Sequence, residues 1–152
     1  MLALREFSPT DDIELISWLR TPEELFYFTG PMLQWPLDSG QLDAVRADPN
    51  QLAWTVVTDT GEPAGHIELS LVGGAIARLV RVLIAPLHRG NGYSTEMVTA
   101  AMTEARALGI NRLHLNVVED NERAIALYEK LGFAHTGRLP DRDTVLTMAR
   151  GL

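Results

Sequence analysis

A nearly continuous run of apolar residues near the middle of the chain predicts a strand with a helix after it. The run consists of Leu79, Val80, Val82, Leu83 and Ile84. Such a run is typical of a strand that is buried on both faces. Pro86 ends the strand, because a residue without a backbone N–H cannot extend a central ladder. After a loop, apolar residues recur at three- and four-residue spacing as far as Gly109, which predicts a helix over residues 94–108.

The loop between this strand and this helix is a candidate anion-binding site. Its sequence is Arg89-Gly90-Asn91-Gly92-Tyr93-Ser94. Two glycines one residue apart allow a sharp turn that directs several N–H groups to one place. The N-terminal N–H groups of the following helix and its macrodipole, roughly +0.5 charge, also favour phosphate. Arg89 adds a mobile positive charge. A tight turn without a ligand is the alternative explanation of the glycines.

Two common nucleotide-binding motifs are excluded at this loop. A dinucleotide-binding loop has a third glycine or an alanine three positions after the second glycine, where this chain has Thr95. A Walker loop ends in Gly-Lys-Ser/Thr, but the one lysine of the chain is Lys130. The glycines therefore belong to neither motif.

The first fifty residues predict one short strand and three helices. Residues 2–7 alternate like a strand, and the segment Ser8 to Asp12 has helix-start chemistry before an apolar group. Thr21-Pro22-Glu23-Glu24 places an N-cap, a proline at the first helical position and a capping-box glutamate ahead of a second helix. A third amphipathic helix is expected over residues 38–48.

Alternation and turn residues predict a sheet in the rest of the chain. The expected strands cover residues 52–58, 64–71, 75–85, 113–118, 133–138 and 144–149. A further helix begins at the N-cap Asn121 and stops at Gly132. Its buried stripe is expected to contain Ala124, Ile125, Leu127, Tyr128 and Leu131. On this pattern alone, Tyr128 is more often a core residue than a catalytic one.

Charge is distributed unevenly along the chain, whose net charge is −7. Residues 1–70 carry a net −9 and residues 71–152 a net +2, so the first part favours a cationic partner and the second tolerates phosphate. No clustered basic face is present, which argues against nucleic acid as a partner. The absence of cysteine excludes disulfides, thiolate zinc sites and a cysteine nucleophile. The histidines lack the spacing of a metal site, so no metal is expected.

Length and hydropathy predict one compact domain away from membranes. A chain of 152 residues buries roughly 68 to 70% of the surface that its unfolded form exposes. No window approaches the ~18 apolar residues of a membrane span, and Met1 to Arg5 shows no targeting pattern. We therefore expect a cytoplasmic protein without a membrane partner.

Two separate motifs resemble the signatures of the GCN5-related N-acetyltransferase (GNAT) superfamily. The first is Ile84-Ala85-Pro86 followed by Arg89-x-x-Gly92, with Ser94 in place of the last small residue of the acyl-CoA loop. The second is Asn-x-x-Ala-x-x-x-Tyr-x-x-x-Gly-Phe, matched by Asn121, Ala124, Tyr128, Gly132 and Phe133. It begins about thirty residues after the glycine loop, as in the family.

The resemblance implies an α+β fold with three layers. We expect a mixed, mostly antiparallel central sheet of six to seven strands flanked by about four helices. Residues 1–152 would form a single domain, with an acceptor side (1–50), a central sheet with the acyl-CoA loop and its helix (52–108), and a C-terminal strand-helix-strand part (112–152). Homodimers are common among such domains, so a homodimer is a candidate assembly.

The resemblance also implies an activity and a co-substrate. The expected reaction transfers the acetyl group of acetyl-CoA directly to a primary amine, either a small molecule or a protein or peptide amine. A CoA-binding module that has lost catalysis and senses acyl-CoA is the alternative.

Roles for individual residues follow from the same resemblance. Backbone groups of Val82, Leu83 and Ile84 should hold the pantetheine arm and provide an N–H for the oxyanion. The loop from Arg89 to Ser94 should bind the pyrophosphate, and Asn121 should touch the arm from the other side. Tyr128 is the expected general acid, since a tyrosine pKa near 10 lies close to a thiol pKa of about 8.5.

The general base and the acceptor pocket are predicted less directly. Glu68 is the first candidate for the base, with a pKa that a carboxylate-poor neighbourhood could raise towards 7; an outward-facing glutamate is the alternative. His66 lies two residues away on the same face and could serve instead, contact the substrate or pair with Glu68. Large side chains between the first helices, among them Tyr27, Phe28 and Trp35, are expected to line the acceptor pocket or to form a satellite core.

Overall fold

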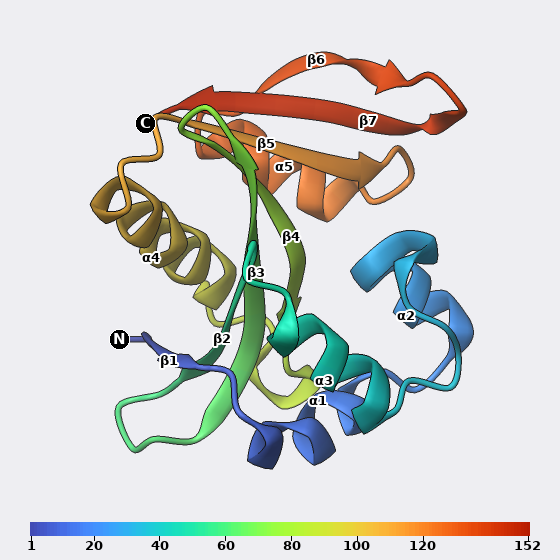
Figure 1. Ribbon diagram of the computed structural model, residues 1–152, viewed down its shortest axis with the longest axis vertical. Helices are drawn as coiled ribbons and strands as arrows, with labels where there is room; N and C mark the ends of the chain where they lie inside the picture. Colours follow the sequence, from blue (N-terminus) through green and yellow to red (C-terminus); the bar gives the residue numbers. More distant parts are fainter.

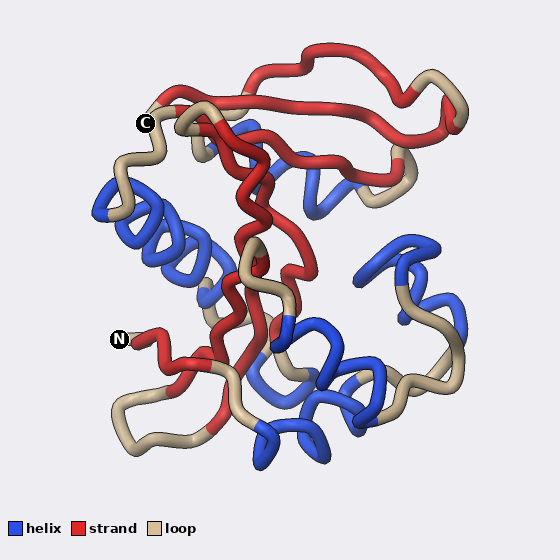
Figure 2. Tube along the Cα trace, in the orientation of Figure 1, coloured by secondary structure: helices blue, strands red, loops and turns tan.

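The backbone forms one mixed sheet with helices on both faces (Figures 1 and 2). The computed structural model describes residues 1–152. The strands are β1 (Ala3–Glu6), β2 (Gln51–Val57), β3 (Pro63–Gly73), β4 (Ile76–Ile84), β5 (Arg112–Val118), β6 (Ala134–Leu139) and β7 (Arg142–Gly151). The helices are α1 (Asp12–Trp18), α2 (Pro22–Thr29), α3 (Ser39–Ala47), α4 (Tyr93–Ala107) and α5 (Glu122–Lys130), with short 3₁₀ turns at Pro9–Asp11, Gly30–Met32 and Pro86–His88.

The sheet has the strand order β1-β2-β3-β4-β5-β7-β6. All neighbouring strands are antiparallel except β4 and β5, which are parallel and are connected through α4. The expected α+β fold with a mostly antiparallel sheet of six to seven strands is therefore confirmed.

The predicted helix starts are confirmed by their cap hydrogen bonds. The Thr21 side chain accepts a hydrogen bond from the backbone N–H of Glu24 at 3.1 Å, and Asp38 caps α3 in the same way. Asn121 accepts from the backbone N–H of Ala124 at 3.4 Å, so the helix that carries Tyr128 begins where the motif predicts. Each cap satisfies an N–H that has no partner inside its helix.

Two hydrophobic cores lie on opposite faces of the sheet. The larger core joins the sheet to α4 and α5, and Arg150 of β7 contacts both helices on that face. The smaller core lies under α1, α2 and α3 and includes Phe7, Leu15 and Phe28. Figure 1 shows α4 and α2 on opposite sides of β3 and β4. The buried stripe expected on α5 is narrower than predicted, because only Tyr128 is fully buried and its apolar neighbours are partly buried against the core.

The strands β4 and β5 separate halfway along β4. Their parallel pairing covers only Ile76 to Leu79 of β4, so one backbone edge of Val80 to Ile84 has no strand partner. The expectation that this strand is buried on both faces is wrong for Val82 and Leu83, which are only partly buried, because β5 diverges from them.

A bulge deforms β4 just before its free edge. Two steps along β3, from His66 to Glu68, oppose three steps along β4, from Leu83 back to Val80. Arg81, inside the bulge, has φ of 50°, a left-handed conformation that costs a non-glycine residue roughly 1–2 kcal/mol. The bulge therefore needs compensating contacts, which the Arg81 side chain makes.

Candidate active site

An inner cavity of about 330 Å³ opens where β4 leaves β5. Its wall on the sheet side is formed by Val82 and Leu83, on the free part of β4. Its full lining is Trp18, Leu19, Glu24, Tyr27, Phe28, Val82, Leu83, Arg89, Asp120 and Asn121. The structure thus brings together residues that were predicted from three distant segments: the acceptor side, the central strand with its loop, and the N-cap of α5.

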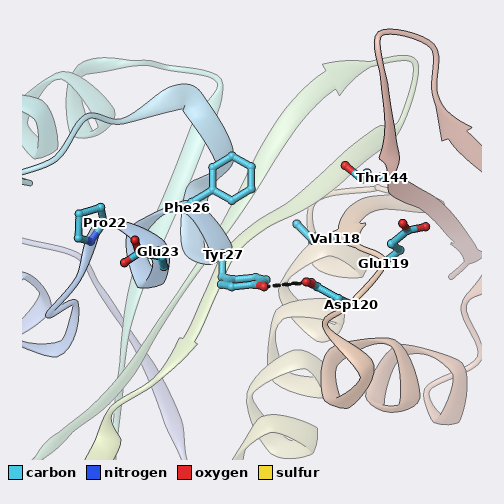
Figure 3. Close-up of a pocket in the computed structure, with 8 residues that line it drawn as sticks. All are labelled: Pro22, Glu23, Phe26, Tyr27, Val118, Glu119, Asp120 and Thr144. Carbon is cyan, nitrogen blue, oxygen red and sulfur yellow. Dashed lines mark hydrogen bonds between the residues drawn. The ribbon is translucent and has the colours of Figure 1, made fainter.

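An outer cavity of about 520 Å³ adjoins the inner one (Figure 3). It is lined by Pro22, Glu23, Phe26, Tyr27, Val118, Glu119, Asp120 and Thr144. Tyr27 and Asp120 belong to both linings. The Tyr27 hydroxyl donates to the Asp120 carboxylate, with distances of 3.0 Å to Oδ1 and 3.1 Å to Oδ2.

The glycine loop has the geometry that an anion site needs. Gly90 and Gly92 have φ of 84° and 74°, and Gly92 is the N-cap of α4. A Cβ placed on either glycine would meet no atom within 4 Å, so the space in front of both is open. Tyr93 and Ser94 are the first residues of α4, where backbone N–H groups have no helical acceptor. These features fit a bulky anionic group such as a pyrophosphate.

Arg89 is exposed and makes one hydrogen bond to the end of β4. Its Nε donates to the Ile84 carbonyl oxygen at 3.2 Å, which holds the base of the guanidinium against the end of β4. The rest of the group lines the inner cavity. The positive charge is therefore held between the glycine loop and the free strand edge, because the chain itself supplies an acceptor there.

The free edge of β4 fits an extended arm. Beyond Leu79, the backbone N–H and C=O groups of β4 that point away from β3 lack a strand partner, and an extended ligand can complete such an edge as an added strand does. Asn121 faces the same cavity from the opposite side. The strand edge, Arg89 and Asn121 thus line one cavity, whereas Gly90 to Ser94 of the glycine loop lie outside its lining.

Glu68 does not have the environment that was predicted for it. The side chain is fully buried, so it is not an outward-facing glutamate, and it lines neither cavity. Burial by itself would raise its pKa, but hydrogen bonds and charges from His66 and Arg81 outweigh burial and lower it. The expected rise towards 7 is wrong, because two donors stabilise the carboxylate.

Glu68 is the centre of a buried network. Its Oε1 accepts from Gln51 Nε2 at 2.7 Å and from Arg81 Nη1 at 2.6 Å. Its Oε2 lies 2.6 Å from His66 Nε2. Arg81 also donates from Nε to the Thr29 hydroxyl of α2 at 2.8 Å. We call these five residues the buried network; it ties the β4 bulge to β2, β3 and α2.

His66 pairs with Glu68, one of the arrangements that their spacing allowed. Its side chain is 1% exposed and its ring packs against Phe7 and Phe28. Direct contact with a substrate, which was also expected of it, does not fit this burial. Nδ1 of His66 is the single buried side-chain polar atom without a hydrogen-bond partner.

Tyr128 is buried, and its hydroxyl makes no hydrogen bond within the chain. The ring packs edge-on against Phe133 with centroids 5.7 Å apart, and burial raises the pKa of Tyr128 to about 12. The expected pKa near 10 is therefore too low, because the phenolate would lose its hydration. Tyr128 lines neither the inner nor the outer cavity.

Two parts of the predicted acceptor pocket have different outcomes. Tyr27 and Phe28 line the inner cavity, whereas Trp35 is 43% exposed and lines neither cavity. Sequence reasoning missed Trp18, Leu19, Glu24 and Asp120. Asp120 directly precedes the N-cap Asn121, so its place at the second motif was a signal that could have found it.

None of the helices is both long and apolar enough to span a bilayer.

Comparison with known proteins agrees with this geometry. The model of the "Acetyltransferase (GNAT) family" matches residues 10–133. The spermidine N(1)-acetyltransferase of Escherichia coli strain K12 is 36% identical over 86 residues, which cover 55% of this chain and 46% of that protein. The peptidyl-lysine N-acetyltransferase YjaB of Salmonella typhimurium is 37% identical over 90 residues, which cover 59% of this chain and 55% of that protein. The chain spans about half the length of the curated relatives that it matches.

A solved structure shows the same fold over nearly the whole chain. The spermidine N-acetyltransferase of Vibrio cholerae, crystallised with CoA and spermine, has a TM-score of 0.85 and 21% sequence identity, and the alignment covers 99% of this chain and 95% of that chain.

Proposed function

This chain belongs to the acetyltransferase (GNAT) family, and we propose that it transfers the acetyl group of acetyl-CoA to a primary amine. The observation that carries the proposal is the meeting of three features at one cavity. They are the free edge of β4, Arg89 at the start of the glycine loop, and the acidic side chains that face the cavity from α2 and the β5–α5 turn. The names of the relatives, which act on spermidine and on peptidyl-lysine, support an amine as the acceptor.

The residues that would hold acetyl-CoA are those of the free edge of β4, the glycine loop and Asn121. The glycine loop, Arg89 to Ser94, would bind the pyrophosphate, and the backbone of Val82 to Ile84 would hold the pantetheine arm with Asn121 opposite. When bound, acetyl-CoA supplies a thioester carbonyl that a neutral amine can attack. A backbone N–H on the free edge of β4 would stabilise the negative charge that develops on the carbonyl oxygen.

Tyr128 is our candidate for the general acid. With a pKa of about 12, the phenol keeps its proton throughout the assay range, but it gives that proton to a thiolate less readily than a tyrosine with the ordinary pKa near 10 would. Its hydroxyl has no competing partner in the chain. The proton would pass from this hydroxyl to the departing thiolate, the attacking nitrogen would release its own proton to solvent, and the phenolate would recover one from solvent. The buried carboxylate of Glu68 is not proposed as the base, because both of its oxygens are already bonded.

The acceptor side of the cleft favours a cation. Glu24 and Asp120 face the inner cavity, and Glu23 and Glu119 face the outer one. Among these four, only Glu119 has an ion-pair partner, Arg138. An amine in water is largely protonated, so this negative surface raises its local concentration at the cleft. Cytoplasmic location and a homodimer stay predictions from the sequence.

Calorimetric titration of acetyl-CoA tests the co-substrate site, with desulfo-CoA and NAD as comparison ligands. We expect micromolar binding of acetyl-CoA and desulfo-CoA and none of NAD. Arg89→Ala should weaken binding roughly 10- to 100-fold, as expected for a charge-assisted hydrogen bond. Arg106→Ala, which removes an exposed arginine from the last turn of α4, is the matched control and should leave binding unchanged. Absence of acetyl-CoA binding would contradict the proposal.

A thiol-release assay with a panel of primary amines separates the enzyme from the alternative, a silent acyl-CoA sensor. Turnover of any amine supports the transferase. Saturable acetyl-CoA binding without turnover across the panel would favour the sensor instead.

A further inference from the structure

A hydrogen bond across the cleft divides the two cavities from one another. Tyr27 comes from α2 and Asp120 from the β5–α5 turn, 93 positions later in the chain. Figure 3 shows the two side chains pointing toward one another across the cleft. Because they are the two residues common to both linings, the inner and outer cavities adjoin one another at this contact.

The negative charge of Asp120 has no cationic partner. Neighbouring Glu119 forms an ion pair with Arg138, but the contact made by the Asp120 side chain is to the neutral phenol of Tyr27. Arg89, the one cation in the inner lining, is bonded to the Ile84 carbonyl oxygen. The bond from the Tyr27 hydroxyl already has a charged acceptor, but an ammonium donor would add the attraction between two opposite charges. An ammonium group would therefore replace the Tyr27 hydroxyl favourably.

The surroundings also specify where such an ammonium would belong in the acceptor. The inner cavity holds the free strand edge, so the reacting amine must lie there without its proton. Asp120 lies at the boundary with the outer cavity, whose wall includes the rings of Phe26 and Tyr27 and the carboxylate of Glu23. The Arg142 guanidinium already lies 5.7 Å from the centroid of the Phe26 ring, so the Tyr27 ring and the Glu23 carboxylate are the groups that suit a cation on an apolar chain.

We propose that Asp120 binds a second ammonium group of a diamine or polyamine acceptor, and that Tyr27 occupies this position until the acceptor displaces it. This inference rests on the proposed acetyl transfer and adds its specificity. The neutral amine enters the inner cavity beside Val82 and Leu83. The charged amine stays at Asp120, and the remainder of the acceptor extends into the outer cavity.

Two probes of equal length test the assignment: 1,4-diaminobutane and butylamine, which differ by one terminal amine. For the wild type we expect kcat/KM to be roughly 10- to 100-fold higher for the diamine, the usual range for a hydrogen bond to a charged group. Asp120→Asn keeps the shape of the side chain and removes its charge. In this variant the kcat/KM values for the diamine and for butylamine should differ by no more than about threefold, and the KM for acetyl-CoA should be unchanged.

Tyr27→Phe should have the opposite effect. Removing the competing hydroxyl frees the Asp120 carboxylate, so the KM for the diamine should fall, by up to about tenfold, since water replaces the lost donor at this exposed carboxylate. In the Asp120→Asn background, the same substitution should leave KM nearly unchanged, since there is no longer a charge to release. A residue that merely lined the cavity would not show this coupling.

Glu122→Gln is the matched control. Glu122 is an exposed carboxylate two residues from Asp120 and lines neither cavity, so its variant should keep the wild-type ratio. Equal kcat/KM for the two probes in the wild type would overturn the Asp120 assignment and leave acetyl transfer standing. An unchanged kcat/KM ratio in Asp120→Asn, or a higher KM for the diamine in Tyr27→Phe, would also overturn the Asp120 assignment. Absence of turnover with every amine would overturn the proposed function together with this inference.

Discussion

Glu68 and Asp120 are both carboxylates near the cleft, but their surroundings are opposite. Glu68 is fully buried, and each of its oxygens is bonded to a side chain of the buried network. Asp120 is exposed, and its one side-chain contact is a neutral hydroxyl from another part of the chain. The first carboxylate has no capacity left for a ligand, whereas the second has a charge that nothing compensates.

The difference separates support of the site from contact with the ligand. Arg81 is strained within the β4 bulge, and its contacts to Glu68 and Thr29 hold it there. The next residues, Val82 and Leu83, form the wall of the inner cavity. We therefore interpret Glu68 as a residue that maintains the shape of the cavity, and Asp120 as one that meets the acceptor.

The largest expected effect is on stability. Glu68→Ala leaves Arg81 without its buried partner and should lower the free energy of unfolding by roughly 3–5 kcal/mol. Asp120→Ala, the matched truncation at the surface, should change it by less than about 1 kcal/mol. Urea unfolding followed by circular dichroism measures both. Equal losses of unfolding free energy in the two variants would contradict the contrast between the buried, hydrogen-bonded Glu68 and the exposed Asp120.

Replacing Tyr128 by Phe should reduce turnover by about 10²-fold, because the leaving thiolate would lose its proton donor. The substitution keeps the buried ring and its contact with Phe133, so acetyl-CoA affinity and stability should change little. The measurements are steady-state thiol release and calorimetry. Unchanged turnover would mean that Tyr128 is only a core residue, on the same side of the comparison as Glu68.

Acid should destabilise the folded chain through Glu68. Its folded pKa lies below the usual value of 4.5, so just below that pH the unfolded chain binds more protons than the folded chain. The stabilisation is complete above pH 4.5 and is lost as the pH falls through the folded pKa. Urea midpoints measured downward from neutral pH should therefore decrease in acid. Glu68→Gln should show a shallower decrease, and an identical one would contradict the role of this carboxylate.

The smallest expected effect is a change in the titration of Tyr27. Its pKa is raised above 10.0, first by the hydrogen bond to Asp120, then by desolvation and by the charge of that carboxylate. In Asp120→Asn the pKa of Tyr27 should return toward its ordinary value, while Tyr128 should still titrate at about 12. Phenolate absorbance against pH measures both. An unchanged Tyr27 titration would show that the hydroxyl is not bonded to Asp120 in solution.

Local features of the fold could be predicted well from the sequence. Thr21, Asp38 and Asn121 cap helices as their neighbours predict, and Gly90 and Gly92 adopt the left-handed backbone that their spacing indicates. These features depend on interactions within a few residues, so the local sequence contains their physical cause.

Residue environments were predicted less well. The apolar run of β4 reads as a strand buried on both faces, yet part of it borders an open cavity because β5 diverges. Glu68 reads as a base with a raised pKa, yet hydrogen bonds and charges from His66 and from Arg81 of the neighbouring strand outweigh burial and lower it. Whether a side chain is buried, and what it meets there, depends on elements that the local pattern does not contain.

By itself, then, the sequence determined the strands, the helices and their caps, together with the two motifs that point to an acyl-CoA site, because each depends on short-range interactions. The tertiary structure decided that the Glu68 carboxylate is buried and fully hydrogen-bonded, whereas the Asp120 carboxylate is exposed and has no cationic partner. Packing of α2 against β4 completes the buried network around Glu68, and the approach of α2 to the β5–α5 turn brings Tyr27 to Asp120. Contacts between residues so far apart in the chain form only when the whole sheet is assembled, so no local pattern could have encoded them.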